Sequence, residues 1–292
     1  MAVLSIQSHV VYGYAGNTAA VFPLQRLGRE VWAVNTVEFS NHTGYGVWRG
    51  QSLDPALAED LVLGLEERDV LGDCEAVLSG YMGAPEAGKA VIRAVRKAKA
   101  RNPNALYCCD PVMGDLGRGF YVKPGIPEFF KQDAIPLADI VTPNQFELEA
   151  LTGMDASSLD AVRKAADAIH SKGPKIILIT SFRNGVSPML KGNAPAGDFL
   201  EMLASDGNRL YRTRTPELPF DSGLAGSGDL TAAVFLSHYL QTKDSKQSLE
   251  LTTASVYGIM EATFKAKAKE LRIIQAQEEL ITPASTFKAL LC

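Results

Sequence analysis

The sequence has few cysteines, no long apolar run and no leader-like N-terminus. Its four cysteines, Cys74, Cys108, Cys109 and Cys292, lack C-x-x-C spacing and the density of a disulfide scaffold, so we expect reduced, structural thiols. No apolar run approaches membrane-spanning length, and residues 1–6 lack the basic flank of a secretory signal. We therefore expect a cytoplasmic protein without a membrane partner.

The sequence also lacks a strong excess of charge. It carries 29 basic and 33 acidic residues, a net charge of −4, and no basic stretch that would follow a phosphate backbone. Nucleic acid is therefore not an expected partner. The 292 residues are 46% hydrophobic, enough for a large core, and contain no low-complexity linker or internal repeat. We expect one domain over residues 1–292.

Short apolar runs alternate with longer amphipathic runs along the chain. Strands are expected at 3–6, 31–39, 76–79, 105–109, 139–141 and 175–180, and helices at 16–27, 55–68, 85–100 and 159–171. A hairpin near one sheet edge is expected at 199–203 and 209–215, and a long helix at 249–269. This order predicts an α/β fold, a mostly parallel sheet with helices on both faces and ligands at the carboxyl ends of its strands.

The segment Gly226-Ser227-Gly228-Asp229 precedes an apolar run that predicts a buried helix. One interpretation is an ordinary glycine turn with Asp229 as the helix cap. The other is a helix mouth whose free N–H groups and dipole receive phosphate. Asp229 would then remove a proton from an alcohol that attacks a phosphoryl group. The rigid helix that follows favours the second interpretation.

Polar residues follow most of the predicted strands, where substrate contacts are expected. They occupy residues 7–9, 40–46 and 80–81, although His42 alone is more typical of a structural histidine. Asp110 and Asp115 follow the strand at 105–109 and are suitable oxygen ligands for Mg²⁺. Asn144 and Glu147 either share one helix face in a site or form a capping box. The residues alone leave these two alternatives open.

Five segments together carry a resemblance that spans nearly the whole chain. They are 5–10 (SIQSHV), 39–45 (FSNHTGY), 109–115 (CDPVMGD), 142–147 (TPNQFE) and 226–229 (GSGD). In these segments, in order, the sequence resembles the pyridoxal kinase family within the ribokinase-like fold. The resemblance implies a three-layer α/β/α architecture with a mostly parallel central sheet. The first two segments resemble the vitamin B6 kinases more than the sugar kinases.

The resemblance implies ATP-dependent phosphorylation of the 5′-hydroxyl of pyridoxal, with pyridoxine and pyridoxamine as alternative substrates, to give pyridoxal 5′-phosphate in vitamin B6 salvage. Asp229 would be the catalytic base beside Gly226, Ser227 and Gly228. The implied substrate-binding residues are Ser8, Val37, Phe39, His42, Thr43, Gly44, Tyr81 and Asp229. The implied nucleotide-binding residues are Asp110, Thr142, Asn144, Glu147, Thr180, Arg214, Thr215, Pro216, Glu217, Gly226, Ser227 and Gly228.

Further expectations also come from the resemblance. Asp110 and Glu147 would hold Mg²⁺, K⁺ would lie beside the phosphates, and the protein would form a homodimer. Residues 116–121 would form a flap that excludes water from the site. Two alternatives remain: a kinase of the same fold for hydroxymethylpyrimidine or another small alcohol, and a non-catalytic protein that binds pyridoxal phosphate. The presence of Asp229, Asp110 and Glu147 argues against the second.

Overall fold

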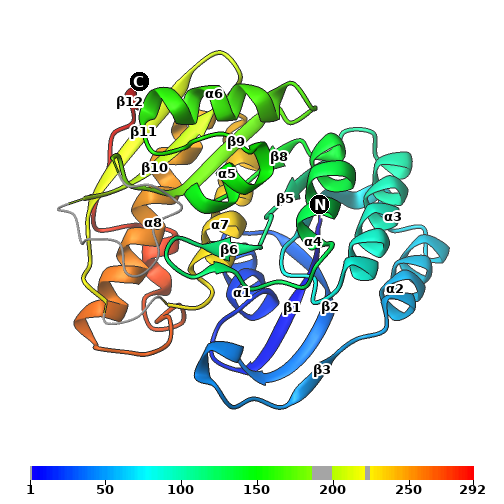
Figure 1. Cartoon of the computed structure of the whole chain (residues 1–292). Helices are drawn as coiled ribbons and strands as arrows, with labels where there is room; N and C mark the ends of the chain where they lie inside the picture. The colour runs from blue at the N-terminus through cyan, green and yellow to red at the C-terminus, as the bar shows by residue number, and fades with distance from the viewer. Residues whose placement is uncertain (1, 186–198, 221–223) are drawn as a thin grey trace.

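The computed structural model describes residues 2–185, 199–220 and 224–292, and its main feature is one ten-stranded sheet (Figure 1). The strand order is β12-β11-β10-β9-β8-β5-β4-β1-β2-β3. The six strands from β9 to β2 are parallel, whereas β3, β10, β11 and β12 pair antiparallel with their neighbours. The strands are β1 (Ala2–Tyr12), β2 (Glu30–Asn41), β3 (Gly50–Ser52), β4 (Cys74–Ser79), β5 (Leu106–Cys109), β8 (Ile140–Val141), β9 (Ile176–Phe182), β10 (Phe199–Ser205), β11 (Leu210–Pro216) and β12 (Leu290–Leu291).

Helices cover both faces of this sheet, as the order of elements predicts. The α-helices are α1 (Asn17–Arg26), α2 (Pro55–Glu67), α3 (Pro85–Arg101), α4 (Ile126–Phe129), α5 (Gln145–Thr152), α6 (Leu159–His170), α7 (Ser227–Thr242) and α8 (Ser245–Lys265). Short helical turns occur at η1 (Thr43–Tyr45), η2 (Leu71–Asp73), η3 (Phe130–Ala134), η4 (Ile135–Leu137) and η5 (Gln277–Leu280). A separate hairpin consists of β6 (Gly114–Asp115) and β7 (Gly119–Phe120).

The core consists of two layers, one on each face of the sheet. Along β9, Ile177 and Ile179 pack with α3 and α6, whereas Ile176 and Leu178 pack with α1 and α7 on the other face. The same alternation occurs in β4 and β5, because successive side chains of a strand point to opposite faces. The predicted three-layer α/β/α arrangement is therefore confirmed.

The predicted strands and helices are all present, and the hairpin of β10 and β11 lies near one edge of the sheet. The C-terminal helix begins and ends earlier than predicted. Its start at Ser245 is set by Asp244, whose side chain accepts from the N–H of Gln247 at 2.7 Å. It ends at Lys265 because Lys267 has φ +48°, a left-handed conformation that stops a helix.

Across 2–185, 199–220 and 224–292, none of the helices is both long and apolar enough to cross a membrane.

Candidate active site

The start of α7 faces the loop that follows β1. Gly226, in the left-handed region with φ +79°, is the N-cap of α7, so the interpretation of Asp229 as the cap is wrong. Asp229 lies within the first turn, three residues after the cap. Its Oδ2 atom accepts a hydrogen bond from the backbone N–H of Gly16 at 2.8 Å. A helix leaves its first N–H groups without internal partners, and here they belong to the glycine-rich segment at 226–229.

The carboxylate of Asp229 lies in a dry environment although the residue is partly exposed. Desolvation raises its pKa above the ordinary value of 3.8, and the hydrogen bond from Gly16 opposes the rise. A carboxylate with a raised pKa is a better proton acceptor than a solvated one. Its position and the direction of its pKa shift suit a general base, a role that stays a prediction.

Ser8 lies beside Gly16 at an irregularity in the pairing of β1 with β2. The register between β1 and β2 shifts between Gln7 and His9, so Ser8 alone stands opposite two residues of β2, Thr36 and Val37, and the bulge lies in β2. Ser8 is buried, and a Cβ atom placed on Gly16 would lie 2.3 Å from its Oγ and 2.2 Å from its carbonyl oxygen. The structure therefore brings Ser8 to the same loop that contacts Asp229. The sequence gives no sign of the bulge.

Three of the expected substrate residues, Val37, Phe39 and Tyr81, meet in one small apolar cluster. Val10 and Ala15 complete it, and both were absent from the predicted site. These five residues come from β1, β2 and the loops after β1 and β4. An apolar wall of this kind suits an aromatic ring.

His42, Thr43 and Gly44 lie on a more exposed turn after β2. The Nδ1 atom of His42 accepts from the N–H of Gly44 at 3.1 Å and caps η1, the local structural role anticipated for a lone histidine. Burial lowers the pKa of His42 first, and the charge of Arg118 on the β6–β7 hairpin lowers it further. The turn and the hairpin are therefore close enough to interact.

Asp110 and Glu147 are the buried carboxylates of the site. The hydroxyl of Thr142 donates to Oδ1 of Asp110 at 2.9 Å. Glu147 accepts backbone N–H groups of Met113 at 2.8 Å and Asn144 at 3.0 Å. Asn144 in turn caps α5, and the two residues form the capping box raised as one alternative. A role of the pair in the site stays a prediction.

Both carboxyl groups are strongly perturbed. Desolvation raises the pKa of Asp110 well above its ordinary value, and the charge of Asp229 raises it further. Desolvation also raises the pKa of Glu147 well above its ordinary value, and the charge of Asp110 raises it further. Clustered, desolvated carboxylates suit a hard cation with oxygen ligands. Among the described residues no three His, Cys, Asp or Glu side chains form a metal cage, a result compatible with Mg²⁺, which uses few protein ligands.

The segment 116–121, predicted as a flap, consists of the turn between β6 and β7, strand β7 itself and Tyr121. Phe120 packs edge-on against Phe146 of α5, with ring centroids 5.0 Å apart. Burial raises the pKa of Tyr121, as do the charges of Asp115, Glu147, Asp229 and Asp110. Tyr121 belongs to the predicted flap, although the sequence assigned it no role of its own.

The remaining expected nucleotide residues lie farther along the same sheet edge. Thr180 is near the end of β9, and its N–H donates to the carbonyl of Pro143 at 3.0 Å. Arg214 is held by Glu201 through two bonds of 2.7 and 2.9 Å, and Glu217 pairs with Arg183 at 2.6 Å. Thr215 and Pro216 complete β11. Their place along a nucleotide groove stays a prediction.

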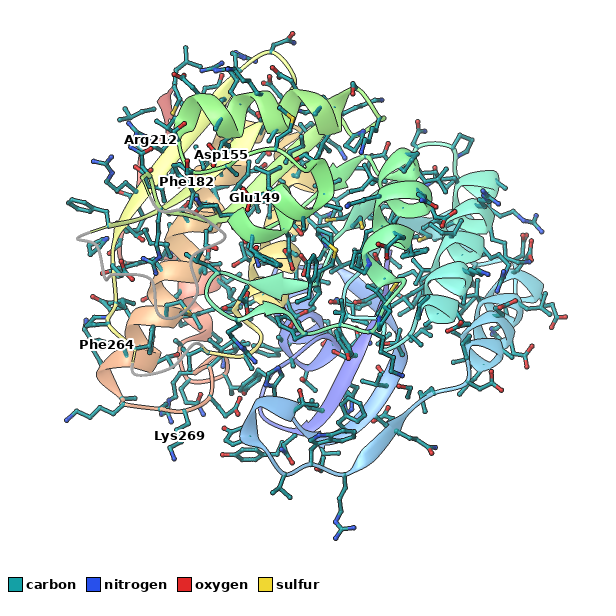
Figure 2. All side chains as sticks on the ribbon, viewed as in Figure 1. Glu149, Asp155, Phe182, Arg212, Phe264 and Lys269 are labelled. Atoms are coloured by element: carbon teal, nitrogen blue, oxygen red, sulfur yellow. The ribbon has the colours of Figure 1, made fainter. Side chains whose placement is uncertain are left out.

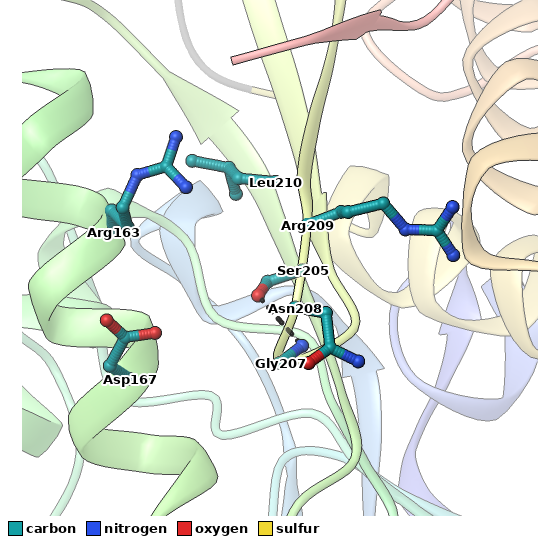
Figure 3. Close-up of a pocket in the computed structure, with 7 residues that line it drawn as sticks. All are labelled: Arg163, Asp167, Ser205, Gly207, Asn208, Arg209 and Leu210. Carbon is teal, nitrogen blue, oxygen red and sulfur yellow. Dashed lines mark hydrogen bonds between the residues drawn. The ribbon is translucent and has the colours of Figure 1, made fainter.

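A pocket of about 170 Å³ lies at the opposite end of the sheet (Figure 3). Arg163 and Asp167 of α6 face the turn between β10 and β11, whereas Arg209 points away from them. Because Ser205 pairs with Ile177 near the start of β9, this turn lies at the amino ends of the parallel strands. The pocket is therefore separate from the carboxyl-end loops that hold Asp229.

Comparison with known proteins agrees with this geometry. Residues 69–273 match the family described as phosphomethylpyrimidine kinase. The chain is 49% identical to pyridoxal kinase PdxY of Rubrobacter xylanophilus over 98% of this chain and 95% of the relative. It is also 49% identical to pyridoxal kinase PdxY of Granulibacter bethesdensis over the full length of both.

Solved structures extend the similarity to the fold. The pyridoxal kinase of Leishmania donovani in complex with ADP and pyridoxamine superposes with a TM-score of 0.88 at 30% identity, over 99% of each chain. PdxK of Plasmodium falciparum with AMP-PNP and PL superposes with a TM-score of 0.84 at 26% identity, over 99% of this chain and 98% of that one. The chain belongs to the pyridoxal kinase family.

Proposed function

We propose that this protein is an ATP-dependent pyridoxal kinase that transfers a phosphoryl group to the 5′-hydroxyl of pyridoxal. The observation that carries the proposal is the position of Asp229, a desolvated carboxylate on the first turn of a buried helix and in contact with the substrate loop. Phosphoryl transfer needs mainly positioning and charge stabilisation, and both are available at this point.

In the proposed reaction Asp229 accepts the proton of the 5′-hydroxyl while the oxygen attacks the terminal phosphorus of ATP. The bond between that phosphorus and its bridging oxygen breaks, and ADP leaves. The N–H groups of Ser227 and Gly228, together with the dipole of α7, stabilise the negative charge on the transferred group. Gly226 allows the left-handed turn that aims these groups. Ser8 and Thr43, with Gly44 and His42, would orient the pyridine ring against the apolar cluster of Val37, Phe39 and Tyr81.

Asp110 and Glu147 fit a role in holding Mg²⁺, which supplies neutralisation of the phosphate charges when it is bound. Thr142 and Asn144 orient these two carboxylates through the hydrogen bonds described above. Thr180, Arg214, Thr215, Pro216 and Glu217 would border the remainder of the nucleotide. Use of K⁺, homodimer formation, cytoplasmic location and a single domain over residues 1–292 stay predictions.

A second candidate is a hydroxymethylpyrimidine kinase, favoured by the family described as phosphomethylpyrimidine kinase. That match begins at residue 69, after Ser8 and the 42–44 turn, so it covers the carboxylates and α7 but not these two proposed ring contacts. The test is a coupled ATP-consumption assay with pyridoxal, pyridoxine, pyridoxamine and hydroxymethylpyrimidine side by side. A preference for the pyrimidine would overturn the proposed substrate and retain the kinase.

A further inference from the structure

One carboxylate outside the predicted site, that of Glu270, contacts both the 13–16 loop after β1 and the 42–45 turn after β2. The hydroxyl of Tyr45, at the end of η1, donates to Oε1 of Glu270 at 2.6 Å. The backbone N–H of Tyr14, in the loop after β1, donates to Oε2 of the same side chain at 3.0 Å. Glu270 lies more than two hundred residues from both partners. It therefore connects the two loops from a third segment of the chain.

The segment that carries Glu270 is firmly attached to the core. The neighbouring residues Leu271 and Ile273 are 1% and 0% exposed and pack with Leu230 and Val234 of α7, the helix that bears the proposed base. The N–H of Arg272 also donates to the buried hydroxyl of Thr263 at 3.0 Å. Figure 2 shows Lys269, the preceding residue, below Phe264 of α8. The backbone around Glu270 is thus anchored in the core.

The contact between Glu270 and the first loop is close. Gly13 has φ +86°, and a Cβ atom placed there would lie 2.4 Å from Cδ of Glu270. A side chain at position 13 would therefore force the carboxylate of Glu270 to shift. The 13–16 loop is consequently held against Glu270 at Gly13. At its other end, the N–H of Gly16 donates to Asp229.

The second loop is more exposed, and its far end is held by a hydrogen bond from Asn41 to the carbonyl of Val47 at 2.9 Å and by packing of Trp48 on Phe39. Residues 43–49 are exposed, and η1 is only three residues long. Tyr45 is 44% exposed; besides Glu270 it meets the ring of Tyr12, with centroids 6.2 Å apart. Segments with few buried contacts unfold locally at low free-energy cost. One charge-assisted hydrogen bond can therefore determine the position of such a turn. Thr43 and Gly44 are on this turn.

We propose that Glu270 is a positioning residue that fixes the 42–45 turn relative to the 13–16 loop and thereby sets the width of the substrate pocket. Both of its partners are hydrogen-bond donors, and an ionised carboxylate can accept from both at once. The inference rests on the proposed function. Glu270 would affect vitamer binding and leave nucleotide use unchanged, because neither loop contains the proposed nucleotide residues.

The test compares Glu270→Ala, Glu270→Gln and Tyr45→Phe in steady-state kinetics with pyridoxal and ATP varied separately. We expect Glu270→Ala to raise the KM for pyridoxal about 10–100-fold, with the KM for ATP unchanged and a smaller effect on kcat. Glu270→Gln should recover much of the loss, since its amide oxygen can accept from Tyr14 and its NH₂ can donate to the oxygen of Tyr45. Equal changes in both KM values would overturn the proposal.

A double variant tests whether Glu270 acts through Tyr45. In a Glu270→Ala background, Tyr45→Phe should add almost nothing, because the shared bond is already absent. Additive losses would overturn the link between them. Glu278→Ala is the matched control: it removes an exposed carboxylate that pairs with Arg26 at 2.9 Å, and both KM values should stay at the wild-type level.

Amide hydrogen exchange of the ligand-free protein separates this inference from the proposed function. Glu270→Ala should accelerate exchange in residues 42–49 and leave the amides of α7 protected. Unchanged exchange in 42–49 would overturn the inference even in an active kinase. Faster exchange there in a protein that phosphorylates no vitamer would support the positioning role while removing the proposed function.

Discussion

The backbone N–H of Gly16 donates to the carboxylate of Asp229 across 2.8 Å. This bond joins the N-cap of α1 to the first turn of α7, two helices on the same face of the sheet. Gly16 has φ +57°, and its missing side chain leaves room for the carbonyl oxygen of Ser8. The proposed base and a proposed ring contact are therefore positioned by one residue.

We expect Gly16→Ala to abolish most activity. The added methyl group would lie 2.2 Å from the carbonyl oxygen of Ser8, and the left-handed backbone would be strained, so the loop must move away from Asp229. The turnover number should fall by at least about tenfold, with a lower melting temperature. Gly28→Ala is the control: it also has positive φ but nothing within 4 Å, so its melting temperature should fall without a comparable loss in turnover.

Asp229→Asn tests the base directly. Asparagine retains an oxygen that accepts from Gly16 but cannot take up the proton of the alcohol, so the turnover number should fall by about 10²–10⁴ while pyridoxal still binds. Turnover should be measured beside pyridoxal binding by calorimetry. Near wild-type turnover would remove Asp229 from the role of base.

The pH dependence of turnover should also report Asp229. Because desolvation raises its pKa above 3.8, the active carboxylate is lost as the pH falls through a value higher than that of an exposed aspartate. The acid limb of the kcat profile should therefore lie above the ordinary aspartate range. In Asp229→Asn the residual activity should lose this limb, and an unchanged limb would assign it to another group.

Asp110 should oppose folding at alkaline pH when no cation is bound. In the folded protein its pKa is raised well above the ordinary value. Its stabilising contribution to the free energy of unfolding is therefore fully present below the unfolded-state pKa. This contribution is lost as the pH rises through the raised pKa of the folded protein. Asp110→Asn should thus melt at a higher temperature than the wild type at about pH 8 without Mg²⁺. Thermal unfolding with and without Mg²⁺ checks this, and a variant that is less stable at every pH would contradict it.

The sequence predicted the layers of the fold better than the contacts within the site. Short apolar runs such as that of β9 and the glycine-rich start of α7 are local signals. The bulge of β2 opposite Ser8 depends on the pairing of two strands, and the hydrogen bond from Tyr45 to Glu270 joins residues 225 positions apart. No local pattern encodes either one. Glu147 shows the intermediate case, since its capping box is readable from spacing but its burial beside Asp110 is not.

The ring contacts are tested by Ser8→Ala and Thr43→Val. Each should weaken the use of pyridoxal by about 1–3 kcal/mol in kcat/KM, because a polar group of the bound ring loses its partner, with the KM for ATP little altered. Ser8 is buried opposite the bulge of β2 whereas Thr43 is exposed on η1, so Ser8→Ala should have the larger effect. Equal losses for pyridoxal and ATP would indicate a folding defect. No loss in either variant would leave a kinase whose substrate is recognised by other residues, and the apolar cluster around Val37 and Phe39 would then be the next surface to vary.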